Sequence, residues 1–328
     1  MAKEHLFERV SRIIAEPFTR TLLDEMAAHA SAPIDEAPLT ESRKALRTLM
    51  LAQERPPVPG VLDEVMEIPG PAEPVPVTVH RPESVDGPLP LAVYIHGGGW
   101  ARGDREMYNQ TCRYFAAAAR CLVVNVEYRL APEHRFPAGL EDCYAVVRWL
   151  SVRGETIGGD PRRVAVLGDS AGGNFAAAIA IMAREEDISL RFQGLIYPGV
   201  DLRKTDIYGS RLKYNNPYYF LDVKRLHWYF DHYLNNPEDA LDPRASPLLA
   251  SSHEGLAPAA IITASLDPLC DEGEVYARTL EAANNSVEYR CFSGTVHGFL
   301  SFSKTVPMGL DAQEWLAERL ARAFTEIR

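Results

Sequence analysis

The clearest chemical signal in the sequence is a serine on a turn between a strand and a helix. Ser170 lies in the pentapeptide 168–172, which reads Gly-Asp-Ser-Ala-Gly and fits the G-x-S-x-G pattern of a nucleophile elbow. The apolar run 164–167 predicts the strand before it, and the alanine-rich run 174–183 predicts the helix after it. A glycine-rich turn without chemistry is the alternative, but the flanking strand and helix favour a nucleophile.

An acid and a base follow two later strands. Asp267 comes after the apolar run 259–264, and His297 comes after the run 287–292. Because the carboxyl ends of parallel strands meet at one edge of a sheet, we expect both side chains to lie close to Ser170. The chain order serine, aspartate, histidine is the order of α/β-hydrolases. His297 would accept the proton of Ser170, and Asp267 would orient the imidazole and stabilise its charged form.

The acid has two other candidates. Asp271 and Glu272 lie at the start of a predicted helix, where negative charges are favourable in any case. If Asp267 only caps that helix, one of these two carboxylates would be the acid. We favour Asp267 and keep the alternative open.

A glycine run supplies the fourth element. The segment 96–99 reads His-Gly-Gly-Gly and follows the short apolar strand 91–95. Backbone without side chains can turn its N–H groups toward one point, as an oxyanion hole requires. We expect Gly98 and Gly99 to be donors together with Ala171, and the loss of one such donor to cost about 3 kcal/mol in the barrier. We expect His96 to orient the glycine loop and to take no part in proton transfer.

The elements that must position these groups alternate between buried strands and helices. Segments 61–68 and 75–80 read as an antiparallel pair, and short apolar strands then alternate with helical patterns. This alternation predicts a parallel sheet with helices on both faces. The predicted elements after the antiparallel pair are strands 91–95, 122–126, 164–167, 194–198, 259–264 and 287–292, and helices 138–152, 174–183, 272–283 and 309–327.

The composition of the chain limits which partners it can bind and indicates where in the cell it works. The formal net charge of −11 argues against nucleic acid and anionic membrane surfaces as partners. No apolar run approaches the roughly 20 residues that cross a bilayer, and the N-terminus lacks the pattern of a signal peptide. We therefore expect a cytoplasmic protein. Its five scattered cysteines form no C-x-x-C pair, which favours reduced, mostly buried thiols.

A metal site and an aromatic cluster are the remaining candidates. His227 and Asp231 are spaced i, i+4 with His232 beside them, but no further ligands at diagnostic spacing accompany them. We expect no metal and no cofactor. The aromatic side chains at 214–233 fit packing within the segment 199–255, and some of them are candidates for the wall of a substrate pocket.

Five motifs together resemble the hormone-sensitive-lipase family of α/β-hydrolase carboxylesterases. They are His-Gly-Gly-Gly-Trp at 96–100, Tyr-Arg-Leu-Ala-Pro-Glu-His at 128–134, Gly-Asp-Ser-Ala-Gly-Gly-Asn at 168–174, Asp-Pro-Leu-Cys-Asp-Glu at 267–272 and His-Gly-Phe at 297–299. The resemblance covers roughly residues 60 to 325.

The resemblance implies an α/β-hydrolase fold, with a mostly parallel central sheet flanked by helices and a helical cap. The cap would consist of residues 1–55 and the insertion 199–255, and the core of residues 56–198 and 256–328. The family also implies a cofactor-free Ser-Asp-His carboxylesterase that acts on small-molecule esters with short to medium acyl chains, and it suggests a homodimer through the edge strand near 287–292.

Two other functions are compatible with the motifs. A deacetylase or amidase would use the same three residues. A non-catalytic receptor for a small ligand is the second alternative, since relatives of the family include the plant gibberellin receptors. Those receptors lack the catalytic histidine, which is present here as His297, so an enzyme is favoured.

Overall fold

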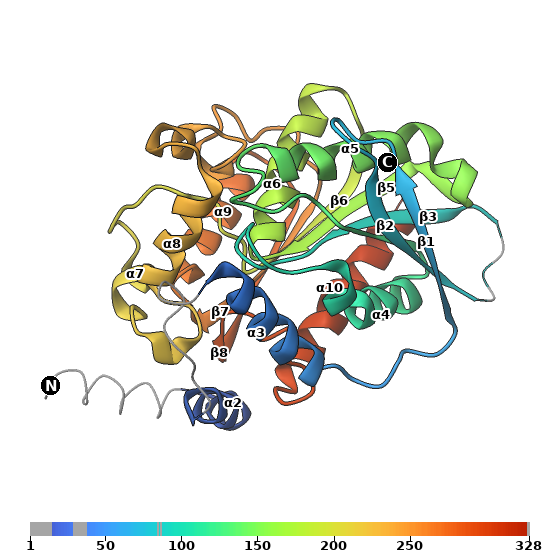
Figure 1. The fold of residues 1–328 in the computed structure, drawn as a ribbon. Coiled ribbons are helices and arrows are strands. Elements are labelled where there is room, and N and C mark those ends of the chain that lie inside the picture. Colours follow the sequence, from blue (N-terminus) through green and yellow to red (C-terminus); the bar gives the residue numbers. More distant parts are fainter. Residues whose placement is uncertain (1–14, 29–37, 84, 86, 327–328) are drawn as a thin grey trace, which may run out of the picture.

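A single mixed sheet forms the centre of the molecule (Figure 1). The computed structural model describes residues 15–28, 38–83, 85 and 87–326, so the predicted N-terminal helical segment (residues 1–55) is described only from residue 15 and without 29–37. Within these ranges the strand order is β1-β2-β4-β3-β5-β6-β7-β8. The strands are β1 (Val61–Ile68), β2 (Val75–Pro82), β3 (Leu89–Ile95), β4 (Leu122–Val126), β5 (Gly159–Asp169), β6 (Leu190–Ile196), β7 (Ala259–Leu266) and β8 (Val287–Val296).

The sheet is parallel from β4 to β8. β2 pairs antiparallel with both β1 and β4, and every other neighbouring pair is parallel. The predicted antiparallel pair and the predicted parallel sheet are both confirmed. β5 and β8 are longer than the sequence predicts, because β5 begins at Gly159 and β8 continues through Val296.

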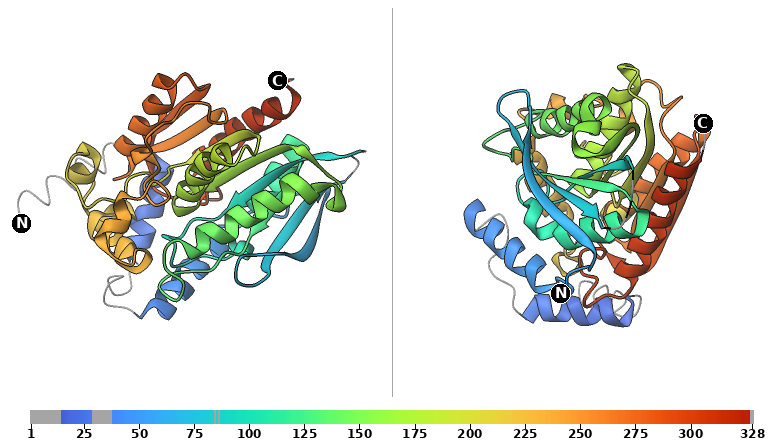
Figure 2. Two further views of the ribbon diagram at one scale, coloured as in Figure 1. Left: turned by 90° about the horizontal axis from the view of Figure 1, so that it is seen from above. Right: turned by 90° about the vertical axis from the view of Figure 1, so that its right-hand side faces the viewer.

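Helices cover both faces of the sheet. α4 (Asn109–Ala119) and α10 (Met308–Thr325) pack on one face, and α5 (Ala138–Arg153), α6 (Ala171–Glu185) and α9 (Cys270–Ala282) pack on the other (Figure 2). Side chains of β3 alternate between the two faces, so that Val93 packs with the second group and Tyr94 with the first. Burial on both faces explains why this strand reads as a continuous apolar run.

The remaining helices gather at one end of the sheet (Figures 1 and 2). They are α2 (Pro17–Ala28) and α3 (Leu39–Ala52) from the N-terminal segment, and α7 (Gly209–Lys213) and α8 (Val223–Tyr233) from the segment 199–255. Arg43 links α3 to the core, because it donates hydrogen bonds to Glu133 and to the Ala101 carbonyl. None of the helices within the described ranges is long and apolar enough to cross a membrane.

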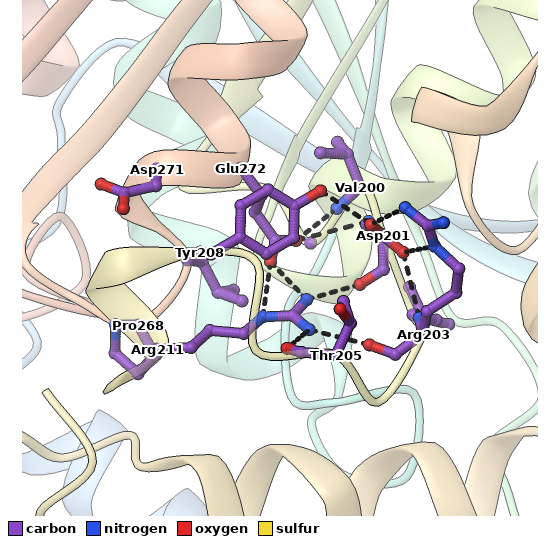
Figure 3. A network of polar contacts seen from close by, with 12 residues as sticks. Val200, Asp201, Arg203, Thr205, Tyr208, Arg211, Pro268, Asp271 and Glu272 are labelled. Atoms are coloured by element: carbon purple, nitrogen blue, oxygen red, sulfur yellow. Dashed lines mark hydrogen bonds and ion pairs between the residues drawn. The ribbon is translucent and has the colours of Figure 1, made fainter. Parts of the chain in front are cut away.

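A buried ion pair joins the segment 199–255 to the core (Figure 3). The Arg211 guanidinium of α7 lies 2.5 Å from Glu272 Oε2 of α9, and both side chains are buried. Glu272 also accepts a hydrogen bond from the Val200 amide (2.9 Å), while Arg211 donates to the Asp201 carbonyl (2.6 Å) and the Arg203 carbonyl (2.8 Å). Burial acts to raise the pKa of Glu272, and the positive charge of Arg211 opposes that shift.

The neighbouring residue of α7 reaches the loop after β7. Ser210 Oγ donates to the Pro268 carbonyl at 2.7 Å, and the Ser210 amide donates to Asp271 Oδ2 at 2.8 Å. Since Asp267 begins this loop, α7 is attached directly to the segment that carries one of the predicted site residues.

Replacing Arg211 should destabilise the fold strongly. Arg211→Met leaves the Glu272 carboxylate buried without its cation, so we expect the free energy of unfolding to fall by about 3 to 5 kcal/mol. Urea denaturation followed by circular dichroism measures the change. Arg278→Met is the matched control, because Arg278 forms an exposed i, i+4 pair with Glu274 and its loss should cost only about 0.3 kcal/mol. Equal losses in the two variants would contradict a structural role for the buried pair.

Candidate active site

Ser170 occupies a strained turn between β5 and α6. Its backbone angles are φ 55° and ψ −117°, a conformation that a non-glycine residue adopts only when the surroundings enforce it. The Ser170 amide donates to the Ile196 carbonyl at 2.8 Å, which ties the turn to β6. A Cβ on Gly172 would lie 1.9 Å from the Ile95 carbonyl oxygen, and one on Gly168 would lie 2.2 Å from the Gly172 carbonyl oxygen. Both positions of this turn therefore require glycine.

The three predicted site residues form one chain of hydrogen bonds. His297 Nε2 lies 2.8 Å from Ser170 Oγ, and His297 Nδ1 lies 2.7 Å from Asp267 Oδ2. Asp267 directly follows β7 and His297 directly follows β8, so the parallel sheet brings both to the end of β5. Asp267 is fully buried, His297 is largely buried and Ser170 is half-buried. This is the arrangement that a serine nucleophile and its general base require.

The alternative acids have other partners. Asp271 accepts a hydrogen bond from the Ser210 amide, and Glu272 pairs with Arg211. Asp267 also accepts from the Leu269 amide at 2.9 Å through its second oxygen, which orients the carboxylate toward His297. Of the three carboxylates left open by the sequence, Asp267 alone contacts His297 within the described residues.

The glycine loop lies beside the serine. Gly98 has φ 124° and Gly99 has φ 64°, conformations that favour glycine. The backbone N–H groups of Gly98, Gly99 and Ala171 donate no hydrogen bond to any residue that the structure describes. Both glycines and Ala171 line the same pocket as Ser170. These amides are therefore available to a bound molecule.

Buried side chains hold the glycine loop in place. His96 Nδ1 lies 2.8 Å from the Gly97 carbonyl oxygen, which only accepts, so the proton is on Nδ1. Burial lowers the pKa of His96 to about 4, and the ring stacks on Tyr128 with centroids 4.3 Å apart. The predicted role of His96 in orienting this loop is confirmed.

Asp169 is the positioning residue that the sequence analysis missed. Its carboxylate accepts hydrogen bonds from the Gly97 amide (2.9 Å), Tyr94 (3.1 Å) and Tyr108 (3.2 Å). It thereby ties the residue next to Ser170 to the glycine loop. Burial raises the pKa of Asp169 to about 6, although these three donors act in the opposite direction. The signal in the sequence was a carboxylate that directly follows a buried apolar strand.

The pocket above Ser170 has walls from several regions of the chain. Of the aromatic residues at 214–233, Phe220 and Tyr229 line it, whereas Tyr214, Tyr219 and Tyr233 are packed elsewhere in the core. Two arginines that the sequence analysis did not single out, Arg102 and Arg225, also line the pocket. Further wall residues are Leu46, Met50, Leu221, Leu226, Leu269 and Phe302.

No metal-binding group stands out in the described ranges of the chain. Groups of three or more His, Cys, Asp or Glu side chains arranged to hold an ion are absent among those residues. Asp231, considered above as a ligand, pairs with Lys204 at 2.6 Å. The five cysteines are free, with three of them buried, Cys270 half-buried and Cys291 exposed.

Known proteins share this architecture. A family model described as alpha/beta hydrolase fold matches residues 92–301. The carboxylic ester hydrolase LipN of Mycobacterium tuberculosis is 39% identical over 278 residues, which are 80% of this chain and 70% of that protein. The chain belongs to the hormone-sensitive-lipase family of α/β-hydrolases. The resemblance found in the sequence motifs is thereby confirmed.

Two further known proteins match over most of the chain. The carboxylesterase NlhH of Mycobacterium tuberculosis is 39% identical over 241 residues, or 73% of this chain and 75% of that protein. The structure of the hyperthermophilic esterase from the archaeon Pyrobaculum calidifontis superimposes with a TM-score of 0.88 at 36% identity, and covers 94% of this chain and 98% of that one. The predicted α/β-hydrolase fold is confirmed.

Asp169 should make stability depend on pH. The folded-state pKa of about 6 lies above the value of about 3.9 in an unfolded chain. The folded state therefore binds the proton more tightly than the unfolded chain does, and protonation of Asp169 stabilises the fold. The free energy of unfolding of the wild type, relative to Asp169→Asn, should therefore rise by about 2 to 3 kcal/mol as the pH falls from 7 to 4. Urea denaturation of both proteins at each pH gives the difference, and a constant difference would contradict the shifted pKa.

Proposed function

We propose that this chain hydrolyses small carboxylic esters through an acyl-enzyme intermediate, with Ser170, His297 and Asp267 as its catalytic triad. The observation that carries the proposal is the continuous path of hydrogen bonds from Ser170 Oγ through both ring nitrogens of His297 to Asp267. Membership of a family whose relatives include carboxylesterases supports the reaction class.

The mechanism follows from the positions of these atoms. Ser170 Oγ attacks the ester carbonyl carbon while His297 Nε2 takes the serine proton. The imidazolium then gives that proton to the leaving alcohol, and the acyl group remains on Ser170. A water molecule, deprotonated by His297, releases the acid and restores the serine. Asp267 keeps the imidazole in the tautomer that this requires and stabilises the imidazolium.

The proposed oxyanion hole consists of the amides of Gly98, Gly99 and Ala171. The developing negative charge on the carbonyl oxygen would receive hydrogen bonds from these groups, each worth about 3 kcal/mol in the barrier. Support comes from the two left-handed glycines beside Ser170 and from the absence of other acceptors for these amides among the described residues. Ala171 is also the first residue of α6, whose N-terminus is favourable to negative charge.

The proposed cap consists of residues 1–55 and 199–255. The pocket wall supports this division, because Leu46 and Met50 come from α3 while Leu226 and Tyr229 come from α8. A mostly apolar wall suits short to medium acyl chains. The homodimer and the cytoplasmic location stay predictions, and deacetylase or amidase activity is an outcome that kinetics would reveal.

Hydrolysis of p-nitrophenyl esters from C2 to C16 tests the reaction. We expect the rate to be highest between C4 and C8 and to fall at least about 10⁴-fold in Ser170→Ala, because this change removes the hydroxyl that is hydrogen-bonded to His297 Nε2 and would carry the acyl group. Diethyl p-nitrophenyl phosphate should label Ser170 in the wild type, as intact-mass spectrometry would show. If a well-folded wild type hydrolyses none of these esters but cleaves matched amides, the chain is an amidase and the ester proposal fails.

The acid is tested by a matched pair of variants. Asp267→Asn should lower kcat by about 10⁴-fold, because the amide no longer holds the required tautomer of His297. Asp271→Asn changes the same chemical group four residues away and should lower kcat far less, since the Asp271 carboxylate accepts from the Ser210 amide and does not contact His297 among the described residues. Steady-state kinetics on p-nitrophenyl butyrate compares them. A larger loss in Asp271→Asn would assign the acid differently.

A further inference from the structure

Two arginines line the pocket that contains Ser170 and His297. Arg102 comes two residues after the motif 96–100, and Arg225 lies in α8. Both side chains are half-buried. A chain with a formal net charge of −11 thus places two positive charges beside its nucleophile.

Neutral groups are the hydrogen-bond partners of these two side chains. Arg102 donates to Ser42 Oγ at 3.0 Å and to the Tyr229 hydroxyl, and Arg225 donates to the Phe220 carbonyl. Neither guanidinium pairs with a carboxylate among the described residues. The Nε atoms of both are buried without a hydrogen-bond partner there.

Two other shielded arginines in this protein are paired with carboxylates. Arg211 lies 2.5 Å from Glu272, and Arg129 lies 2.7 Å from Asp142. Such pairing is favourable, because a shielded charge without a counter-charge is costly. Arg102 and Arg225 lack such a partner among the described residues, and both line a pocket in which a ligand could supply the anion.

The pocket itself offers these arginines no free carboxylate. Asp169 is the only acidic residue among the described pocket-lining residues, and its oxygens already accept from Gly97, Tyr94 and Tyr108. Burial lowers the pKa of Arg102, and the nearby positive charge of Arg225 lowers it further. The two guanidinium groups are therefore close enough for their charges to interact, and both line the same pocket.

We propose that Arg102 and Arg225 bind a carboxylate of the substrate, so that the preferred substrates are esters that carry a second, ionised carboxyl group. This rests on the proposed esterase function. A guanidinium presents parallel N–H groups that match the two oxygens of a carboxylate. The ester carbonyl lies at Ser170, and the carboxylate lies either on the acyl side or on the alcohol side of the molecule.

Two matched pairs of esters test the preference. Monoethyl glutarate and ethyl 5-methylhexanoate differ on the acyl side, and 2-acetoxypropanoate and 3-methylbutan-2-yl acetate differ on the alcohol side. In each pair an isopropyl group replaces the carboxylate at nearly equal shape. Titration of released acid at constant pH gives kcat/KM for all four. We expect the charged member of at least one pair to be preferred by about tenfold or more, and that pair identifies the side on which the carboxylate lies.

Variants then assign the preference to the arginines. Arg225→Met should reduce the charged-to-neutral ratio of kcat/KM by about tenfold, mainly through KM, and Arg225→Lys should retain some of it because the charge remains. Arg102→Met should act in the same direction. Arg278→Met removes an equal charge from the exposed face of α9 and should leave the ratio unchanged. Thermal unfolding checks each fold, and Arg225→Met decides if Arg102→Met does not fold.

The possible outcomes separate this inference from the proposed function. Hydrolysis of p-nitrophenyl butyrate together with equal or lower kcat/KM for the charged member of both pairs overturns the carboxylate site and leaves the esterase intact. An unchanged ratio in Arg225→Met also overturns it. Failure of the folded wild type to hydrolyse any of the five esters overturns the esterase, and the carboxylate site with it.

Discussion

The site depends on one buried carboxylate. Asp169 lies at the end of β5, one residue before the serine, and accepts hydrogen bonds from the amide of Gly97 and from two tyrosines. A carboxylate in this position is costly to desolvate, as its raised pKa shows. Its three donors offset some of that cost. The Asp169 side chain thereby fixes the turn that presents Ser170 to the loop that presents the glycine amides.

A second buried charge fixes the outer layer. The Arg211–Glu272 pair and the contacts of Ser210 attach α7 to the loop after β7, which also begins with Asp267. The segment 199–255 is therefore connected to the loop of the proposed catalytic acid as well as to the pocket wall. Displacement of α7 would therefore disturb the contacts of Ser210 with Pro268 and Asp271, which lie one and four residues after Asp267.

The sequence was informative where function depends on local pattern. The strand, turn and helix around Ser170, the glycine run at 96–99 and the positions of Asp267 and His297 could all be predicted, because strand ends and turn chemistry are encoded by neighbours in the chain. Asp169 was missed, since its partners Tyr94 and Gly97 lie more than 70 residues away. Pairings of this kind are set by packing between elements, which one sequence alone does not specify.

Glu272 and Arg225 illustrate the same limit. The sequence presented Glu272 as an ordinary charge at a helix N-terminus, yet it is fully buried against Arg211. Arg225 lies on a helix whose pattern indicates only an amphipathic surface, and no neighbour in the sequence suggests that it lines the pocket. The partner of Glu272 comes from the segment 199–255, and the pocket that Arg225 lines is formed by several elements far apart in the sequence.

The origin of the pocket wall bears on how such an enzyme diversifies. Ser170, Asp267 and His297 lie at strand ends of the central sheet, whereas part of the wall comes from α3 and α8, which add no strand to it. Substitutions on those two helices can alter the shape and charge of the chamber without disturbing the hydrogen-bonded groups beneath it. Evolution can thus change the substrates of such an enzyme while the catalytic groups, and with them the reaction, are retained.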